Sequence, residues 1–255
     1  MNAMRWAILG TGAIASTFAR ALPRSRTGTL RAVGSDFPAR AAGFAARHGE
    51  VASGSYADVL ARDDVDAVYI GTVHTTHAAL AIASLTAGKA VLCEKPAALS
   101  LEEAERMFAA ARSAGMPLVE AYKYRFAPIA ARARALVETG AIGSPERVVA
   151  QSGFVAPDRS GRLFDPLLAG GAIFDIGGYP MSLAIGVARW AGVDGAASIL
   201  SADGDLGSTG GRDGTRSPAH RPHRSRAHRL DRQRPCAARH GVRQPRLARP
   251  VGNLG

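Results

Sequence analysis

The chain has 255 residues, a formal net charge of +11 and an apolar content of 47%, enough for one large domain or two smaller ones. This composition excludes disorder along the whole chain, and no apolar run is expected to approach the ~20 residues that a transmembrane helix needs. Two cysteines, Cys93 and Cys236, are too few for a disulfide framework, so a cytoplasmic location is expected. Residues 1–22 fit a strand, a glycine turn and a helix better than a secretory signal.

The positive charge is concentrated at the C-terminus. Residues 201–255 hold twelve Arg, no Lys, four Asp and no Glu, a net +8, which leaves +3 for the preceding residues. This tail is rich in Pro, Gly and His, and it shows neither the period of a strand nor that of a helix. Because it has so little to bury, we predict that it is disordered, with a boundary near residues 206–215.

Taken in chain order, the first part alternates between strand and helix patterns. Strands are predicted at residues 5–9, 29–35, 66–71, 90–93 and 116–120, and helices at 13–22, 39–48, 56–61, 77–87 and 100–114. At the start of the last helix, Ser100 and Glu103 have the spacing of a capping box, in which each side chain bonds the other's backbone N–H. Short links between alternating elements predict a parallel, doubly wound α/β sheet.

The pattern changes near residue 124, where a second domain is expected to begin. A helix is predicted at residues 128–139, a longer strand at 146–154 and another helix at 175–191. The predicted organisation is therefore a first domain at 1–123, an incomplete α+β domain at 124–206, and a disordered basic tail at 207–255.

A glycine turn between the first strand and the first helix reads Gly10-Thr11-Gly12-Ala13-Ile14-Ala15. Gly10 allows the tight turn, Gly12 lets the backbone approach a pyrophosphate, and Ala15 is small enough for helix–sheet contact. The N–H groups at the helix N-terminus would bind the phosphates. The alternative is a glycine turn without a ligand, and the position inside a strand–turn–helix unit favours the dinucleotide.

The end of the second strand bears on the choice between NAD and NADP. Ser35 and Arg40 would suit a 2′-phosphate, whereas the carboxylate of Asp36 would bind a ribose 2′-hydroxyl. The residues support both cofactors, so this choice stays open.

Lys95 is a candidate catalytic residue in the sequence Glu94-Lys95-Pro96. It directly follows the strand at residues 90–93, and ligands bind at the carboxyl ends of strands in open α/β sheets. Only three lysines occur in the chain, and a lysine can donate a proton, which an arginine cannot. The alternative is an ordinary surface lysine in a loop.

Asp175 and Tyr179 form a second candidate constellation. Their spacing of four residues places them on one face of a helix, where a carboxylate can orient a phenol or a substrate hydroxyl. The alternative is structural, with Asp175 as a helix cap and Tyr179 as a packing residue.

Five motifs, in this order, resemble the Gfo/Idh/MocA oxidoreductases: AILGTGAIA, AGKAVLCEKP, EAYKYRF, GAIG and FDPLLAGGAIFDIGGYPMSLA. The resemblance covers roughly residues 4–206 and is strongest to the branch of dimeric dihydrodiol and D-xylose dehydrogenases. It implies a Rossmann domain followed by an open, mostly antiparallel sheet. It also implies NAD(P)-dependent hydride transfer on a sugar, polyol or diol, with a homo-oligomer as the family's usual state and no metal ion.

The resemblance also implies residue roles. Lys95, Asp175 and Tyr179 match the catalytic positions, with Tyr179 as the acid/base and Lys95 lowering its pKa, although these two roles could be exchanged. Thr72, His74 and Glu94 join the cofactor site, to which Lys95 also belongs, and Tyr124 and Arg162 are substrate-binding candidates. His77 stays outside the catalytic set, because a histidine there more often packs than reacts.

The match stops near SILSADGDLGSTG, where the family's sheet would continue. The Arg-, Pro- and His-rich text that follows is typical of a GC-rich gene read out of frame, so we interpret it as a frameshift product. A truncated sheet would compromise activity and oligomerisation, which makes an inactive dinucleotide-binding protein an alternative. Nucleic-acid binding through the tail is a weaker alternative, because the tail lacks lysine and aromatic residues.

Overall fold

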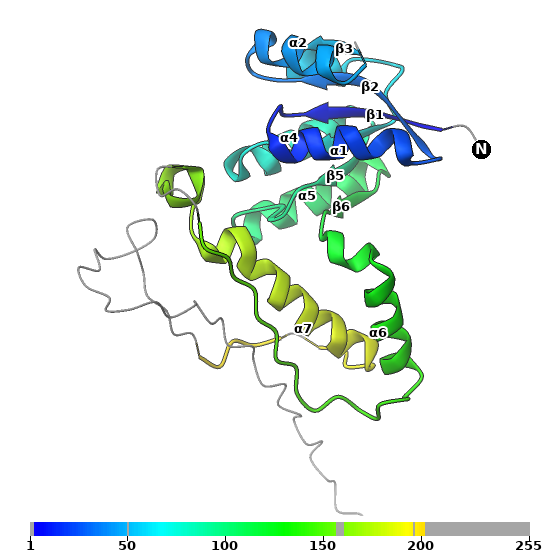
Figure 1. The fold of residues 1–255 in the computed structure, drawn as a ribbon, viewed down its shortest axis with the longest axis vertical. Helices are drawn as coiled ribbons and strands as arrows, with labels where there is room; N and C mark the ends of the chain where they lie inside the picture. The colour runs from blue at the N-terminus through cyan, green and yellow to red at the C-terminus, as the bar shows by residue number, and fades with distance from the viewer. Residues whose placement is uncertain (1–2, 50, 157–160, 196, 202–255) are drawn as a thin grey trace, which may run out of the picture.

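A computed structural model describes residues 3–49, 51–156, 161–195 and 197–201, so the predicted disordered tail at 207–255 lies outside the described residues. The fold is built on a six-stranded sheet with the order β3-β2-β1-β4-β5-β6 (Figure 1). Each of the five strand pairs is parallel. The order reverses direction between β1 and β4, which is where a doubly wound sheet binds its ligand. The predicted doubly wound α/β fold is confirmed.

The strands are β1 (Met4–Leu9), β2 (Gly28–Gly34), β3 (Ala52–Gly54), β4 (Ala67–Ile70), β5 (Ala90–Cys93) and β6 (Leu118–Glu120). The helices beside them are α1 (Ala13–Ala21), α2 (Pro38–Arg47), α3 (Tyr56–Leu60), α4 (His77–Thr86) and α5 (Leu101–Ala114). These bounds agree closely with the predicted ranges. Strand β3 was not predicted, because its sequence Ala-Ser-Gly has no apolar alternation and only pairing with β2 makes it a strand.

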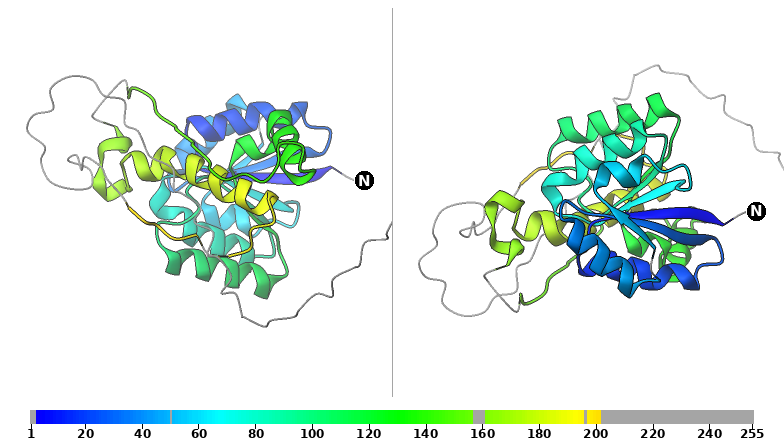
Figure 2. Two further views of the ribbon diagram at one scale, coloured as in Figure 1. Left: turned by 90° about the horizontal axis from the view of Figure 1, so that it is seen from below. Right: turned by 90° about the horizontal axis from the view of Figure 1, so that it is seen from above.

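Side chains on successive strand residues pack into two different cores. Leu9, Val68 and Ile70 belong to a cluster that also holds Met107 of α5 and residues of α4, whereas Ile8 packs on the other side with Ala15 of α1. Figure 2 shows the matching arrangement, with α1 and α2 on one face of the sheet and α4 and α5 on the other. Because both faces are covered, the central strands β4 and β5 are continuous apolar runs rather than alternating ones.

The predicted capping box at α5 is only half formed. The Ser100 hydroxyl accepts a hydrogen bond from the Glu103 backbone N–H at 3.1 Å, as expected. The Glu103 carboxylate, however, accepts from the backbone N–H of Leu99 and not from that of Ser100. The carboxylate therefore ties down the residue that precedes the cap. A complete box forms at α3, between Ser55 and Asp58.

Beyond β6 the architecture changes to helices and extended chain. A 3₁₀ turn η3 (Lys123–Phe126) leads into α6 (Pro128–Glu138), and the segment η4 (Arg162–Phe164), η5 (Pro166–Leu168) and the π-helical turn η6 (Ile173–Gly177) leads into α7 (Gly178–Trp190). Helix α6 packs against α7 below the sheet in Figure 1.

The predicted strand at residues 146–154 is wrong. The chain there is extended but carries no ladder, and the part of the chain that the structure describes after β6 contains no strand at all. An apolar, β-rich sequence becomes a strand only when a neighbouring strand accepts its backbone hydrogen bonds. The open antiparallel sheet expected for residues 124–206 is accordingly not seen among the described residues.

The expectation that no apolar run approaches the length of a transmembrane helix also needs correction. Pro166–Trp190 is a 25-residue helical stretch of hydropathy 1.3, long and apolar enough to cross a membrane by length and composition alone. In the fold it comprises η5, η6 and α7, and Ala169 between them adopts a left-handed conformation at φ 53°. Ala169 thus separates η5 from the continuous helical segment of η6 and α7, and this segment contains Asp175, which forms ion pairs.

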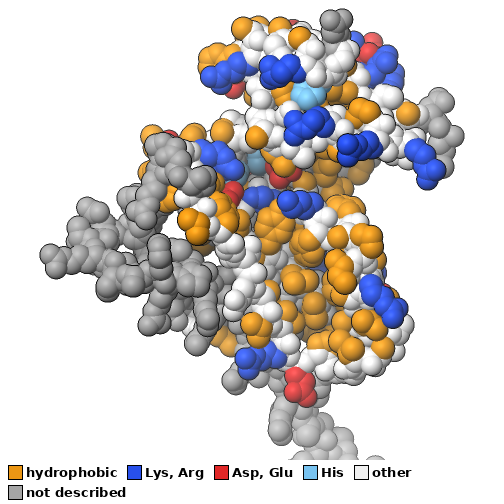
Figure 3. Space-filling model, in the orientation of Figure 1, with side chains coloured by type: hydrophobic (Ala, Val, Ile, Leu, Met, Phe, Trp, Pro, Cys, Tyr) orange, Lys and Arg blue, Asp and Glu red, His pale blue; other side chains and the backbone are white. Residues whose placement is uncertain are grey.

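Apolar side chains gather on the surface over α6 and α7 (Figure 3). Large exposed apolar residues from these helices and the turn before α6 are Phe126, Ile129, Met181 and Ile185. Contiguous exposed apolar surface of this kind promotes association.

Candidate active site

The predicted dinucleotide loop has the shape that its glycines suggested. Gly10, at the end of β1, has φ +106°, and a Cβ atom there would lie 2.7 Å from the carbonyl oxygen of Gly71. Only glycine fits this close approach between the ends of β1 and β4. Gly12 has no such clash, since a Cβ there would be 3.9 Å from the same oxygen. The space beside Gly12 is therefore open for a ligand.

The start of helix α1 fits a bound phosphate. Gly12 is its N-cap and supplies no side-chain hydrogen bond, and the first turn contains no acidic residue. The N–H groups of Ala13 and Ile14 are thus not satisfied by a cap, and they carry the positive end of the helix dipole. A pyrophosphate is the group that such a glycine-flanked helix N-terminus accommodates.

The residues at the end of β2 are compatible with both NAD and NADP. Ser35 is buried and its hydroxyl accepts a hydrogen bond from the Phe37 N–H at 3.3 Å. Asp36 and Arg40 are exposed, and the Arg40 guanidinium lies 4.6 Å from the centre of the Phe37 ring. Arg40 and Asp36 are therefore both accessible, while Ser35 shapes the turn that presents them.

Lys95 meets Asp175 across the boundary between the sheet and α7. The Lys95 ammonium donates to the backbone carbonyl of Asp175 and lies 3.4 Å from its Oδ1 atom. Arg162 from η4 lies at the same distance from that carboxylate oxygen. Two cations thus share one buried carboxylate, and residues that are 80 positions apart in the sequence form one site.

Tyr179 completes this group. The Lys95 ammonium is 5.5 Å from the centre of the Tyr179 ring. Burial, together with the carboxylates of Glu94 and Asp175, raises the pKa of Tyr179. The sequence led us to expect that Lys95 would lower this pKa. The difference has a physical reason, since burial of the phenol and the two nearby carboxylates all favour its neutral form.

His74 is buried beside Arg162. The Arg162 guanidinium lies 3.4 Å from His74 Nε2, and because a guanidinium only donates, Nε2 must be the acceptor and Nδ1 must carry the hydrogen. That Nδ1 atom has no hydrogen-bond partner among the described residues. Burial, with Arg162 nearby, lowers the pKa of His74 to about 4. His74 is therefore a neutral imidazole at neutral pH, in the turn η2 (His74–Thr76) that follows β4.

His77 has a different environment. It is fully buried, and its ring nitrogens lie 2.8 Å from the carbonyl oxygen of Pro96 and 3.3 Å from that of Thr72. The ring thus joins the loop after β4 to the loop after β5. Burial lowers the pKa of His77. These contacts are those of a structural residue.

The Glu94 carboxylate accepts a hydrogen bond from Tyr69, a residue that was not predicted from the sequence. The buried Tyr69 hydroxyl donates to Glu94 Oε1 at 2.7 Å, and the Tyr69 ring stacks on Phe18 of α1 at 4.0 Å. Burial and the Glu94 carboxylate raise the pKa of Tyr69. Tyr69 therefore connects the helix of the glycine loop to the loop that carries Lys95.

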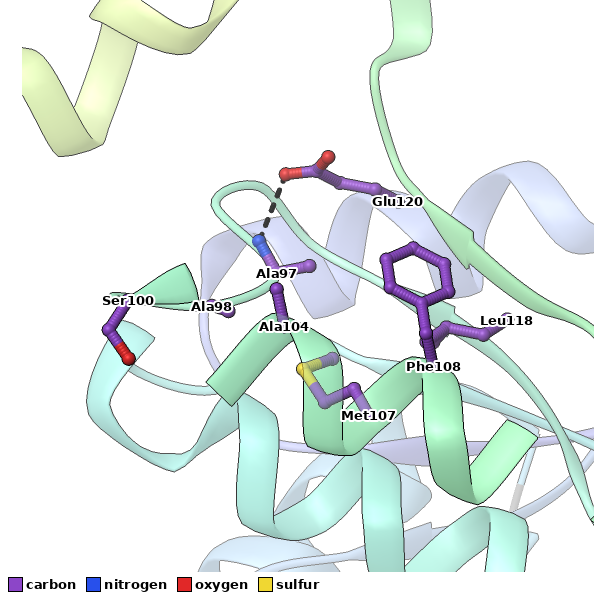
Figure 4. A pocket seen from close by; sticks show the side chains of 8 residues that line it. All are labelled: Ala97, Ala98, Ser100, Ala104, Met107, Phe108, Leu118 and Glu120. Atoms are coloured by element: carbon purple, nitrogen blue, oxygen red, sulfur yellow. Dashed lines mark hydrogen bonds between the residues drawn. The ribbon is translucent and has the colours of Figure 1, made fainter. Parts of the chain in front are cut away.

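A small apolar pocket lies between α5, β6 and residues 97–98 of the loop that follows β5 (Figure 4). Its walls include Met107, Phe108 and Leu118, and the Ala97 N–H donates to Glu120 Oε1 at 3.0 Å. Lys95, Asp175 and Tyr179 do not line it. The pocket is therefore separate from the candidate active site.

The structure brings together most of the residues singled out in the sequence. Lys95, Asp175, Tyr179, Arg162 and His74 form one connected group. Tyr124 reaches this region through its ring, 6.2 Å from that of Tyr179, while its hydroxyl pairs with Ser182. Helical spacing could have drawn attention to Ser182, since it lies three residues after Tyr179 and seven after Asp175.

Comparison with known families identifies the chain's relationships. Residues 4–122 match the oxidoreductase family with an NAD-binding Rossmann fold, and residues 130–205 match the GFO/IDH/MocA C-terminal domain. The chain belongs to the Gfo/Idh/MocA oxidoreductase family. The resemblance predicted from five motifs and the expected Rossmann fold are both confirmed.

Among curated proteins, trans-1,2-dihydrobenzene-1,2-diol dehydrogenase from Bos taurus is 39% identical over 181 residues, which are 69% of this chain and 53% of that protein. D-xylose 1-dehydrogenase (NADP(+)) 2 from Haloferax volcanii is 38% identical over 71% of this chain and 56% of its own length. The chain thus spans about half the length of the curated relatives it matches.

Solved structures give the same relationship. A 3-ketoreductase from Actinomadura kijaniata, in complex with NADP and TDP-benzene, superposes with a TM-score of 0.65 at 33% identity, over 72% of this chain and 57% of that one. An NAD-binding oxidoreductase from Klebsiella pneumoniae has a TM-score of 0.66 at 28% identity, over 74% and 54% of the two chains. Members of the family thus include proteins named for each of the two cofactors.

Proposed function

We propose that this site catalyses hydride exchange between NAD or NADP and a secondary hydroxyl of a sugar, polyol or diol. The observation that supports it most directly is the meeting of Lys95, which follows β5, with Asp175 and Tyr179 at the same carboxyl edge of the sheet as the loop at Gly10. A positively charged group, a carboxylate and a phenol at the carboxyl end of a parallel sheet can together bind a hydroxyl and move its proton. The nicotinamide ring would supply the hydride acceptor or donor.

Each residue has a defined part in this proposal. Tyr179, whose pKa is raised, keeps its proton near neutral pH and so suits proton donation to a carbonyl oxygen, the direction of reduction. Lys95 would hold the substrate oxygen and stabilise negative charge on it, and Asp175 keeps Lys95 in place. In the oxidation direction the same proton returns, and either Tyr179 or Lys95 could receive it. Arg162 is a substrate-binding candidate, because its guanidinium is partly exposed beside Asp175.

The substrate class and cofactor come from the relatives. The relatives named above act, by their names, on a trans-dihydrodiol, D-xylose or a ketone, and all of these reactions interconvert a hydroxyl and a carbonyl group. Gly10, Thr11, Gly12, Ala13 and Ile14 would bind the pyrophosphate, and Asp36 or Arg40 would contact the adenosine ribose or its phosphate. Thr72, His74 and Glu94 would surround the remainder of the cofactor. We further propose that the enzyme is cytoplasmic and that its first domain ends at residue 123, with the second domain beginning at residue 124.

The test measures dinucleotide binding and turnover separately. The purified full chain is titrated with NADH and NADPH by fluorescence and assayed with a panel of aldoses, polyols and trans-diols. Lys95→Met and Tyr179→Phe should each lower turnover by about a hundredfold or more, while the dissociation constant of the dinucleotide stays within about twofold. Near-full turnover in either variant would remove that residue from the mechanism.

The same experiment distinguishes the alternative. The absence of an antiparallel sheet among the described residues after β6 favours a protein that binds a dinucleotide without turning over a substrate. Saturable dinucleotide binding with no turnover across the panel would support that alternative and overturn the proposed enzyme activity.

A further inference from the structure

One face of the helical segment that carries Asp175 and Tyr179 is turned toward the sheet domain. Asp175, Gly178, Tyr179 and Ser182 follow the i, i+3, i+4, i+7 spacing of one helix face. Asp175 contacts Lys95, and a Cβ atom at Gly178 would lie 2.5 Å from the Tyr122 hydroxyl. Ser182 is the last member of this face, and it contacts the turn η3 that directly follows β6.

Ser182 is an unusual helical serine. Its side chain is buried, and its hydroxyl oxygen accepts from Arg125 Nη2 at 2.7 Å and pairs with the Tyr124 hydroxyl at 2.8 Å. Ser84 shows the ordinary alternative, since its hydroxyl donates to the Leu80 carbonyl oxygen within its own helix. Ser182 therefore joins α7 to η3 through two side-chain hydrogen bonds, one of them to a charged group.

The partners of Ser182 are themselves fixed by aromatic packing. The Arg125 guanidinium lies 5.1 Å from the centre of the Tyr122 ring, and Tyr122 and Tyr124 both contact the Tyr179 ring, at 5.6 and 6.2 Å. Tyr122 is buried, and burial with the nearby Glu120 carboxylate raises its pKa to about 12. The rings and the Ser182 hydrogen bonds thus hold one turn of α7 against residues 122–125.

We propose that Tyr124, Arg125 and Ser182 form a clamp that positions Asp175 and Tyr179 over Lys95. The three are positioning residues, because their hydrogen bonds hold α7 and do not reach Lys95. Only the predicted effect of the clamp on turnover rests on the proposed function. Its effect on the Lys95–Asp175 contact is independent of whether the chain turns over a substrate. Misplacing a reacting group by about 1 Å can cost up to about a hundredfold in rate, so a clamp outside the site can control catalysis.

The three lysines of the chain allow a direct test. Reductive methylation followed by mass spectrometry gives the labelling rate of Lys95, whose side chain is 14% exposed beneath Asp175. Lys89, which donates to the carbonyl oxygens of Arg62 and Val65, is the internal control for unfolding of the sheet domain. Ser182→Ala should raise the Lys95 rate about tenfold and leave the Lys89 rate unchanged. Ser84→Ala, a buried serine in α4, should leave both rates unchanged.

If Ser182→Ala destabilises the whole fold, a milder variant still tests the clamp. Tyr124→Phe removes one hydroxyl and retains the ring, and it should raise the Lys95 rate about threefold with Lys89 unchanged. Unchanged Lys95 labelling in both variants would overturn the clamp, and so would equal increases at Lys95 and Lys89 in Tyr124→Phe.

Turnover then separates the clamp from the proposed function. Ser182→Ala should lower kcat about tenfold at an unchanged dinucleotide dissociation constant, and Ser182→Thr, which restores a hydroxyl, should recover most of it. In a Tyr179→Phe background, Ser182→Ala should lower the residual rate by less than it lowers the rate of the parent chain, because the part of its effect that acts through the phenol is already lost. An equal loss in both backgrounds would overturn the clamp. Full turnover in Tyr179→Phe alone would instead count against the proposed function.

Discussion

Residues 4–122 and the described residues beyond 122 bury apolar surface to very different extents. In the first region Ile8, Leu9, Val33 and other strand residues are completely buried between helices on both faces of the sheet. In the second, the buried apolar residues are small or few: Ala150, Pro180 and Ala188. Large side chains there stay exposed, such as Val155 at 92%.

The region with the larger apolar core is therefore not the region that supplies most of the candidate catalytic side chains. The sheet region contains the glycine loop and Lys95, and it has a complete core. Asp175, Tyr179 and Arg162 come from the region that buries little, so their positions depend on a few contacts such as Lys95–Asp175 and Ser182–Arg125. We therefore expect dinucleotide binding to withstand changes that abolish turnover. The following predictions test this separation, from the largest expected effect to the smallest.

Gly10→Ala should weaken dinucleotide binding by at least about a hundredfold. The variant combines the strain of a side chain at positive φ with a contact of 2.7 Å to Gly71 O, at the place where β1 meets the loop. Fluorescence titration with NADPH measures the change. Gly49→Ala is the matched control, because Gly49 has a similar φ of +100° with open space around it. Equal losses in the two variants would mean that the effect is general strain and not the ligand site.

The two tryptophans report on the two regions, since Trp6 lies in β1 and Trp190 ends α7. In Trp190→Phe, the remaining Trp6 fluorescence should show a urea midpoint roughly 1 M higher than that of Trp190 in Trp6→Phe. A dinucleotide should raise the Trp6 midpoint, because it binds the folded sheet region. A common midpoint for both probes, with circular dichroism as the reference, would show that the regions unfold as one unit.

Acid should destabilise the contact between the regions through His74. Its pKa is lowered to about 4 in the fold and is about 6.5 in the unfolded chain, so the unfolded state binds more protons between these values. The stabilising effect is therefore complete above pH 6.5 and is lost as the pH falls toward 4. Urea midpoints at the Trp190 probe should fall over this range, and His74→Gln should reduce the slope. An unchanged slope would assign the pH dependence to other groups, such as His77, whose pKa burial also lowers.

Much of the sheet region could be predicted from the sequence because its signals are local. Apolar strands such as residues 90–93, the glycine turn at Gly10 and the cap at Ser100 depend on neighbours a few residues away. Strand β3 was missed because its three residues become a strand only through pairing with β2. The strand at residues 146–154 was predicted wrongly for the same reason, since its sequence has β-forming residues but the described structure offers no partner.

For the site, the sequence supplied residues but not their electrostatics. Lys95, Asp175 and Tyr179 were identified by spacing and family resemblance, and they do meet. The direction of the Tyr179 pKa could not be predicted, because it depends on burial of the phenol and on the Glu94 and Asp175 carboxylates that the fold brings near it. Tyr69 was missed because a buried tyrosine in a strand has no distinctive local pattern. Ser182 was missed although its helical spacing from Asp175 and Tyr179 could have drawn attention to it.

The sequence by itself determined the alternation of strands and helices, the glycine turn after the first strand, the family and the concentration of charge in the last 55 residues. Those properties follow from local periodicity, from backbone sterics at glycine and from composition. Only the tertiary structure decided which carboxylate neutralises Lys95, which hydroxyl joins α7 to η3, and where a predicted strand lacks a partner. Pairing, burial and desolvation arise between segments distant in sequence, so no local pattern encodes them.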